Sequence, residues 1–318
     1  MSSLRRGIIG AVLCLILAVA FQYTRPGSML KRAVTMSRAP VIALSHGGGP
    51  MPILGDPGHK EITYSLRNRV PRLLGLGTPQ APRAIVLVTA HWSTYTPTIT
   101  SGSSPDLIYD YYGFPPESYA LKYPAPGSPS VAEEVKKAME AQGLKPTLDA
   151  FRGWDHGVFV PLLLVNPKAD IPVVQVSVLS SEDPGQHFAM GRALASLRDQ
   201  NVAIVGSGFA SLHNLRKMGE LVGGGATFSP FKKRSDEWNE ALGDVVRRAN
   251  ETERLKGLEG WRDLPHAYEM HPRGGGEHFM PLIVCAGAAG EEVAGGYRDK
   301  FLGIDVWTYY WGGGKLEE

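Results

Sequence analysis

Five of the nine histidines in this sequence lie beside apolar runs, each in a segment that contains glycine or proline. They are His46, His91, His156, His213 and His278. Neutral imidazole is the commonest metal ligand in proteins, and it suits zinc, copper, iron and nickel. An ion held by neutral nitrogens keeps a net positive charge and can lower the pKa of a bound hydroxyl or water. The sequence therefore predicts a transition-metal site if these residues meet in space.

The apolar segments next to the five histidines in the sequence could bring them together in the fold. Three of the histidines follow predicted buried strands at residues 41–44, 84–90 and 202–205. The other two, His156 and His278, stand where helices are predicted to begin, because the proline after each is tolerated in a first helical turn. The ligand crevice of an open α/β sheet lies beyond the carboxyl ends of its strands. Although 45, 65, 57 and 65 residues separate these positions, we expect them to converge.

Further strands are predicted at residues 172–178 and 303–310, and predicted helices alternate with the strands. The helices are expected at residues 60–75, 129–142, 184–199 and 231–250. Such alternation is typical of α/β proteins. No repeat or linker divides residues 39–318. We therefore expect a single α/β domain, with a central twisted, mostly parallel sheet flanked by helices.

The composition is that of an ordinary folded protein. The 318 residues are 43% hydrophobic and 20% charged, which argues against disorder, collagen and coiled coil. Lysine plus arginine number 33 against 31 acidic residues, without a long basic block, so nucleic acid is not expected as a partner. Two cysteines in apolar runs make a disulfide framework improbable. The composition does not indicate an oligomeric state.

The amino-terminal segment is predicted to be a leader. Residues 7–21 carry no charge and follow Arg5 and Arg6, a pattern that suits a signal peptide or a short membrane anchor. A buried core helix is the alternative. We assign residues 1–38 to this leader, with membrane contact through residues 7–21, and residues 39–318 to the catalytic domain. If translation starts at Met36, the protein is expected to be cytoplasmic.

The remaining histidines and an aromatic segment have plainer interpretations. The four other histidines lack a position at a strand end and are expected to be structural: His59, His187, His266 and His271. Six aromatic residues in one segment are candidates for the wall of an aromatic-substrate pocket, with loop packing as the alternative. They are Tyr109, Tyr111, Tyr112, Phe114, Tyr119 and Tyr123. Arg216 is a candidate for binding a substrate carboxylate or for an exposed ion pair.

Six segments in this order resemble the class III extradiol ring-cleavage dioxygenases, in their DOPA-dioxygenase-like branch. The segments are SHGGGP (45–50), TAHWST (89–94), YYGFPPESYALKYPAPGSP (111–129), WDHGVFVPL (154–162), GSGFASLHNLR (206–216) and EHFMPLIVCAGAAG (277–290). The resemblance covers residues 39–310 and implies a twisted α/β fold around a non-haem Fe²⁺ centre. Because some members hold zinc, Zn²⁺ is the other candidate metal.

The resemblance also implies roles for the histidines. His46, His91 and His278 correspond to the metal ligands, and Glu277 is the alternative to His278 as the third ligand. His213 is placed at the metal or beside it. His156 is placed in the substrate pocket. His156 and His213 are therefore the candidate catalytic residues, and His213 also remains a candidate ligand.

The implied reaction is the opening of a catechol ring by O₂. A catechol-type, DOPA-like substrate binds the metal through both hydroxyl oxygens, and His156 or His213 takes a proton. The partners expected are therefore a small catechol and O₂. Two alternatives stay open at this point: a hydrolase that uses the same ion to activate water, and a non-catalytic binding or signalling protein on the same fold.

Overall fold

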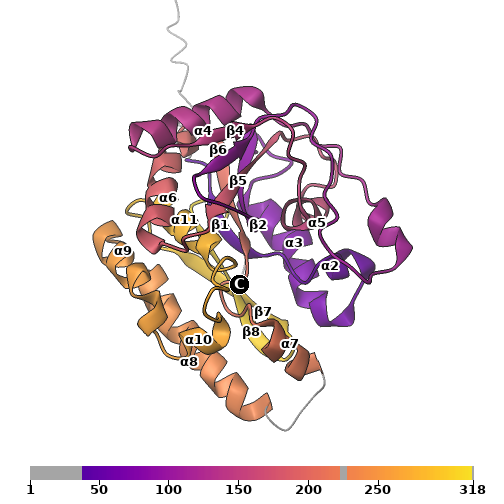
Figure 1. Ribbon diagram of the computed structural model, residues 1–318, viewed down its shortest axis with the longest axis vertical. Helices are drawn as coiled ribbons and strands as arrows, with labels where there is room; N and C mark the ends of the chain where they lie inside the picture. The colour runs from indigo at the N-terminus through magenta and orange to yellow at the C-terminus, as the bar shows by residue number, and fades with distance from the viewer. Residues whose placement is uncertain (1–37, 223–227, 317–318) are drawn as a thin grey trace, which may run out of the picture. The chain divides into compact units, whose positions relative to one another are not determined.

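The core of the protein is an eight-stranded sheet (Figure 1). The structure, a computed structural model, describes residues 38–222 and 228–316. The strands are β1 (Val41–Ser45), β2 (Ala84–Thr94), β3 (Thr98–Thr100), β4 (Thr147–Asp149), β5 (Val173–Leu179), β6 (Val202–Gly208), β7 (Gly295–Phe301) and β8 (Ile304–Trp311). Their spatial order is β4-β3-β5-β2-β6-β1-β8-β7. Strands β5, β2, β6 and β1 are parallel, and β8 runs antiparallel to β1.

The four central strands are mostly apolar and mostly buried because helices cover both faces of the sheet. Every residue of β1, β5 and β6 is buried, without the alternation of a half-exposed strand. Ile85 and Val86 of β2 point to opposite faces and are both fully buried, so branched side chains fill both sides. Burial on both faces is why these strands are recognisable in the sequence as continuous hydrophobic runs.

Helices surround the sheet in two layers. They are α2 (Met51–Leu54), α3 (Lys60–Leu73), α4 (Pro129–Ala141), α5 (His156–Val165), α6 (Pro184–Arg198), α7 (Leu215–Val222), α8 (Phe228–Val246), α9 (Glu251–Glu259), α10 (Ala267–Met270) and α11 (Met280–Ala288). The chain moves from β1 to β2 in one direction along the sheet and from β5 to β6 in the other. Because such crossovers are right-handed, α3 and α5 cover one face, and α6 and α11 cover the opposite face (Figure 1). This reversal creates a crevice at the carboxyl ends of the strands.

The predicted single α/β domain with a mostly parallel sheet is confirmed. The predicted strands are present, but β2 extends to Thr94, so His91 lies inside the strand. Between Thr89 and Ser93 of β2, the pairing with β5 advances by a single residue, so the intervening residues form a bulge. The predicted helix at 231–250 instead spans Phe228–Val246. Of the β7–β8 hairpin only β8 was predicted, as a strand at residues 303–310. The strand β7 and the short strands β3 and β4 were not predicted.

The predicted leader lies outside the described residues, apart from Arg38. Within residues 38–222 and 228–316, none of the helices combines the length and apolar character needed to span a bilayer. The membrane segment expected at residues 7–21 is therefore not tested by the fold.

Candidate metal centre

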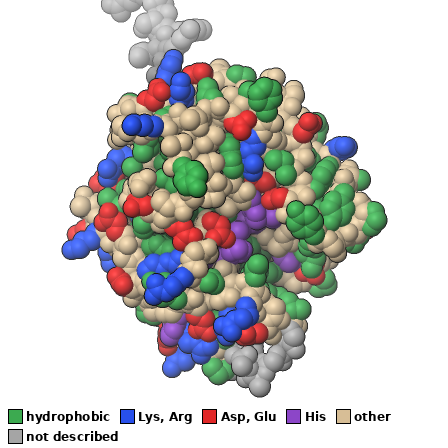
Figure 2. All heavy atoms as spheres, viewed as in Figure 1, with side chains coloured by type: hydrophobic (Ala, Val, Ile, Leu, Met, Phe, Trp, Pro, Cys, Tyr) green, Lys and Arg blue, Asp and Glu red, His purple; other side chains and the backbone are tan. Residues whose placement is uncertain are grey.

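All five predicted site histidines meet at the carboxyl ends of β1, β2 and β6. The His46 ring centroid lies 5.0 Å from that of His91, 5.7 Å from His156 and 5.4 Å from His278. His91 and His156 are 3.8 Å apart, and His213 and His278 are stacked at 3.3 Å. Figure 2 shows histidine side chains gathered near the middle of one face, with acidic side chains beside them. Segments far apart in the chain therefore form one cluster.

His46 is positioned by the end of β1 and by a braced loop. Its backbone N–H donates to the carbonyl of Gly208 at 3.3 Å, which continues the pairing of β1 with β6. The backbone N–H of Gly48 donates to His59 Nε2 at 2.9 Å, and His59 Nδ1 donates to Asp56 at 2.7 Å. The loop after His46 is thus held by a second, buried histidine.

His91 is positioned by the bulge in β2. A bulge re-aims a side chain at the point where pairing is interrupted. The backbone N–H of His91 donates to Thr89 Oγ1 at 3.1 Å, and this hydroxyl donates to buried Asp155 at 2.8 Å. Gly157 packs against the same place, because a Cβ atom there would lie 2.8 Å from His91 Cδ2. His91 is therefore fixed by contacts from two elements.

The other two buried histidines start helices, as predicted. His156 is the first residue of α5, and its backbone N–H donates to Asp110 Oδ1 at 2.9 Å. His278 lies two residues before α11, and its carbonyl accepts a hydrogen bond from Phe209 at 2.9 Å. A Cβ atom at Gly208 would lie 2.3 Å from that carbonyl oxygen, so only glycine permits this approach. The helix starts are thus locked to the strand ends.

The imidazoles of His46, His91 and His278 point their Nε2 atoms at one another. The His46–His91 and His91–His278 Nε2···Nε2 distances are 3.2 and 3.3 Å. One ligand nitrogen from each of the three lies within 4.8 Å of the others. Two nitrogens that share an ion at about 2.1 Å are about 3.0–3.4 Å apart for bond angles between 90° and 109°. The observed spacing therefore fits three ligands around one ion.

The opposite nitrogens of these rings identify their tautomers. His278 Nδ1 lies 2.9 Å from Glu277 Oε1, and His91 Nδ1 lies 3.4 Å from Asp110 Oδ2. His46 Nδ1 lies 3.0 Å from Ser207 Oγ, whose only proton goes to the carbonyl of Gly157 at 2.5 Å. His46 and His278 thus carry the proton on Nδ1 and donate it, and the ion-pair contact of His91 with Asp110 favours the same tautomer in His91. In that tautomer the three Nε2 lone pairs face each other, which is a donor set suited to a cation.

Electrostatics keep these three rings neutral. Burial, and after it the neighbouring imidazoles, lower the pKa of His46 and of His91 well below the ordinary value. Burial lowers the pKa of His278 to about 4. Burial raises the pKa of Glu277, but the hydrogen bonds from His213 and His278 outweigh it and leave the pKa below its ordinary value. A metal ion therefore does not have to displace a proton from these Nε2 atoms near neutral pH.

His156 and His213 each share a carboxylate with a member of this trio. His156 Nδ1 donates to Asp110 Oδ1 at 2.8 Å, and Asp110 Oδ2 lies 3.4 Å from His91 Nδ1, at ion-pair distance. His213 Nδ1 lies 3.2 Å from Glu277 Oε1, which also accepts from His278. His213 therefore groups with Glu277 and His278, and the grouping of three convergent imidazoles does not include it. Both histidines keep Nε2 as an acceptor.

The histidines expected to be structural make local contacts. His187 Nε2 accepts from Leu179, and His271 Nε2 donates to the carbonyl of Ala210. His266 pairs with Glu237 at 2.7 Å. These three lie outside the described metal-ligand groupings, as does His59. The sequence interpretation of them holds.

The aromatic segment divides between the site and the surface. Tyr111 is buried, with its ring centroid 5.7 Å from that of His156, and Phe114 packs on Gly49 beside it. Tyr112 is exposed, and Tyr123 packs on Trp154. The candidate Arg216 is also exposed. The wall beside His156 is therefore formed by part of the segment.

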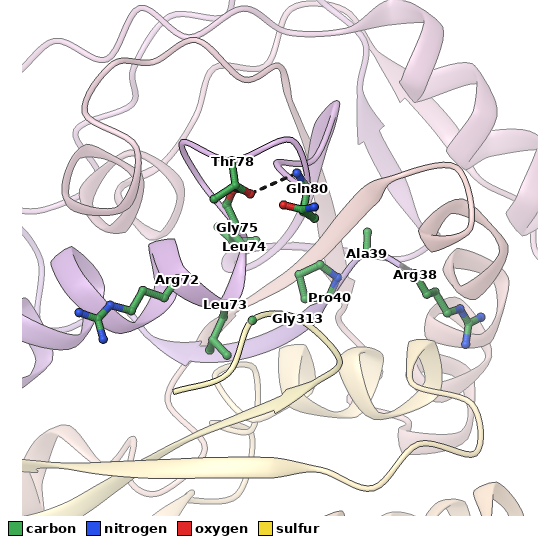
Figure 3. A pocket seen from close by; sticks show the side chains of 11 residues that line it. Arg38, Ala39, Pro40, Arg72, Leu73, Leu74, Gly75, Thr78, Gln80 and Gly313 are labelled. Atoms are coloured by element: carbon green, nitrogen blue, oxygen red, sulfur yellow. Dashed lines mark hydrogen bonds between the residues drawn. The ribbon is translucent and has the colours of Figure 1, made fainter. Parts of the chain in front are cut away.

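A cavity of about 320 Å³ lies away from the histidines (Figure 3). Ala39 and Pro40 line it just before β1, with Leu73 at the end of α3 and Gly313 after β8. It lies at the amino end of β1, whereas His46 follows the carboxyl end. The lining contains none of the five site histidines.

Comparison with known proteins gives this geometry a family. The model of the "Catalytic LigB subunit of aromatic ring-opening dioxygenase" matches residues 33–308. The chain belongs to this family. It is accordingly an enzyme of the aromatic ring-opening dioxygenase class, and the resemblance to class III extradiol dioxygenases is confirmed.

Individual members of the family match over most of their length. Dioxygenase tasH of Hapsidospora irregularis is 59% identical over 289 residues, which are 89% of this chain and 88% of that protein. The 4,5-DOPA dioxygenase extradiol of Portulaca grandiflora is 39% identical over 67% of this chain and 75% of its own. A crystal structure of an uncharacterized protein from Escherichia coli K12 has a TM-score of 0.63, 31% identity, and coverage of 86% and 100%.

Sequence reasoning missed three side chains that complete the site. Ser207 accepts the Nδ1 proton of His46, Asp110 accepts that of His156 and lies at ion-pair distance from His91, and His59 braces the glycine loop. Asp110 lies between the tyrosines that were considered for the wall, and Ser207 lies in the GSG segment after a predicted strand. Their proximity to those motifs was the available indication, but neither residue type is distinctive by itself.

Proposed function

We propose that this family member is a non-haem extradiol dioxygenase that opens the ring of a catechol-type, DOPA-like substrate with O₂. The observation that carries the proposal is the convergence of the Nε2 atoms of His46, His91 and His278, with acceptors beside Nδ1 of His46 and His278 and a carboxylate 3.4 Å from Nδ1 of His91. Three protein ligands leave coordination positions open, which is the arrangement of non-haem Fe(II) oxygenases. The relatives named 4,5-DOPA dioxygenase extradiol support a DOPA-like substrate.

In this proposal His46, His91 and His278 hold the ion. Glu277 is less suited as a ligand, because its Oε1 accepts protons from His278 and His213. Fe²⁺ is the proposed metal and Zn²⁺ the alternative resident ion. When bound, iron would supply positions for both substrate hydroxyl oxygens and for O₂, and it would pass electrons from the catecholate to O₂.

The protein residues then manage protons and orientation. Nε2 of His213 or His156 accepts the proton that a catechol hydroxyl loses on binding, because Nδ1 of each ring is already committed to a carboxylate. Tyr111 packs beside His156 and provides an aromatic surface for the substrate ring. His213 is proposed to act beside the metal, since its Nδ1 groups with Glu277 and not with the convergent trio.

Oxygen consumption by iron-loaded protein tests the proposal. The full-length protein is loaded anaerobically with Fe(II) and offered a panel of catechols, including DOPA, in an oxygen electrode. We expect O₂ uptake in equal amount to substrate, together with a yellow semialdehyde product. Protein that binds iron and takes up no O₂ with any catechol would contradict the proposal.

Two variants and a control assign the roles. His91→Ala is expected to lose the metal, whereas His156→Ala is expected to keep the metal and lose rate. His266→Ala is the matched control, since His266 pairs with Glu237 outside the cluster. If both site variants retain iron as the wild type does, the ligand assignment is wrong.

A further inference from the structure

The carboxylate of Asp110 connects a proposed ligand to a proposed proton acceptor. Oδ1 accepts two hydrogen bonds from His156, from the backbone N–H at 2.9 Å and from Nδ1 at 2.8 Å. Oδ2 lies 3.4 Å from His91 Nδ1. The two rings lie 3.8 Å apart by centroid, with planes inclined at 52°. A single side chain thus contacts both imidazoles from the side away from their Nε2 atoms.

Asp110 is held in a rigid segment. Ile108 donates to the carbonyl of Trp154 at 2.7 Å, and Trp154 donates back to Asp106 at 2.8 Å. This pairing anchors the chain two residues before Asp110 to the chain two residues before His156. The neighbouring Tyr109 and Tyr111 both donate their hydroxyl protons to carbonyls of the same segment, at 2.7 and 2.6 Å. Supports of this kind fix a functional side chain before any ligand binds.

The chemistry of the contacts fixes the proton positions. An ionised carboxylate only accepts hydrogen bonds, so Nδ1 of His156 must carry hydrogen and its Nε2 must lack it. The ion-pair contact at 3.4 Å favours the same form in His91. Asp110 is half-buried, with 25% of its side chain exposed, so bulk water does not replace its two partners freely.

We propose that Asp110 is a positioning residue that fixes the Nδ1–H tautomer and ring orientation of both His91 and His156. Its catalytic consequence rests on the proposed function. Asp110 makes two short contacts with His156, the proposed proton acceptor, and one longer contact with His91, a proposed ligand. Replacing Asp110 is therefore expected to lower the rate of reaction more than the metal affinity. Removing a partner of this kind typically costs tenfold to 100-fold in metal affinity or activity.

Asp110→Asn is the principal test. The amide offers one acceptor oxygen and turns its NH₂ group toward the other Nδ1–H, so one ring loses its acceptor. With the full-length iron-loaded enzyme, we expect kcat to fall tenfold to 100-fold, KM to change less than threefold, and metal affinity to change less than tenfold. Asp110→Glu, which keeps the carboxylate, is expected to recover part of kcat. The control is Asp106→Asn, an exposed carboxylate in the same segment, which is expected to behave as the wild type.

A double-mutant cycle with His156→Gln separates positioning from general damage. If Asp110 acts through His156, the double variant loses no more kcat than His156→Gln alone. Additive losses would overturn the proposal, as would an Asp110→Asn enzyme whose kcat stays within threefold of the wild type. Equal losses in the Asp106→Asn control would overturn it too.

A measurement without turnover distinguishes this proposal from the proposed function. Nitrogen-15 NMR of the zinc-loaded protein reports which ring nitrogen of each histidine carries hydrogen. We expect the Nδ1–H form for His91 and His156 in the wild type, and a mixture including the Nε2–H form for His156 in Asp110→Asn. If no catechol supports O₂ uptake but the tautomers change as stated, the function is wrong and the positioning role stands. Unchanged tautomers in Asp110→Asn would reject the role.

Discussion

Two carboxylates flank the metal centre, and each joins one proposed ligand to one further histidine. Asp110 joins His91 to His156, and Glu277 joins His278 to His213. We call these pairs of contacts the Asp110 arm and the Glu277 arm. They use the same chemistry, because in each arm one carboxylate lies against the Nδ1 atoms of two imidazoles, on the side away from Nε2.

The arms differ in how the chain builds them. Glu277 is adjacent to His278 in sequence, and the rings of its arm are stacked at 14°. Asp110 is 46 residues from His156 and reaches it from another segment, with rings inclined at 52°. The His213 side chain is 17% exposed, against 7% for His156. Only the Glu277–His278 contact is local, because His213 lies 64 residues from Glu277 in the sequence, so both arms depend on tertiary packing. The Glu277 arm is the more open of the two.

Replacing the two histidines of the Glu277 arm should give the largest contrast. His278→Ala removes one of three ligands, and we expect metal affinity to fall more than 100-fold. His213→Ala leaves the three convergent Nε2 atoms in place, so metal content should remain near one ion per chain while kcat falls. Metal analysis after dialysis measures both. Equal metal loss in the two variants would make His213 a ligand.

Acid should affect stability through histidines outside both arms. Burial lowers the pKa of His187 to about 4, so the unfolded chain takes up a proton first as the pH falls. The stabilisation is full above pH 6.5 and is lost as the pH falls from about 6.5 to about 4, by up to about 3 kcal/mol. Urea unfolding of metal-free protein at several pH values measures the loss. His187→Gln should flatten the slope, and an unchanged slope would assign the loss elsewhere.

Neutralising each carboxylate should separate the arms. Glu277→Gln leaves one of two Nδ1 protons without an acceptor, and its contact with the ligand His278 is short, at 2.9 Å. We expect metal affinity to fall tenfold to 100-fold, a larger loss than in Asp110→Asn, whose contact with His91 is 3.4 Å. Competition with a chelator gives both affinities. The reverse order would show that contact length does not rank the arms.

The smallest expected loss of metal affinity comes from replacing Ser207, the hydrogen-bond partner of the third ligand, His46. His46 has no carboxylate and donates to Ser207, a neutral acceptor. Ser207→Ala should lower metal affinity by up to about tenfold, since a neutral hydrogen bond contributes less than a charge-assisted one. The same chelator competition measures it. A loss as large as that of Glu277→Gln would remove the distinction between the charged arms and His46.

Local sequence patterns were enough to predict the parts of the fold that burial dictates. Strands β1, β2, β5 and β6 are mostly apolar because helices cover both of their faces, and three site histidines, His46, His91 and His213, follow or end such strands. The edge strands β3 and β4 have three residues each, too few for a periodic pattern. Asp110 was missed because its role arises from contacts with residues far along the chain. No local periodicity encodes such a contact.

The bulge in β2 constrains the length of the chain as well as its composition. Three residues of β2 lie between Thr89 and Ser93, whose pairing partners in β5 are adjacent in sequence. They are Ala90, His91 and Trp92. Since side chains alternate in direction along a strand, deleting or inserting one residue here would turn the imidazole of position 91 away from its neighbours. Natural or engineered variants should therefore tolerate substitutions beside His91 more readily than any change in residue number between Thr89 and Ser93.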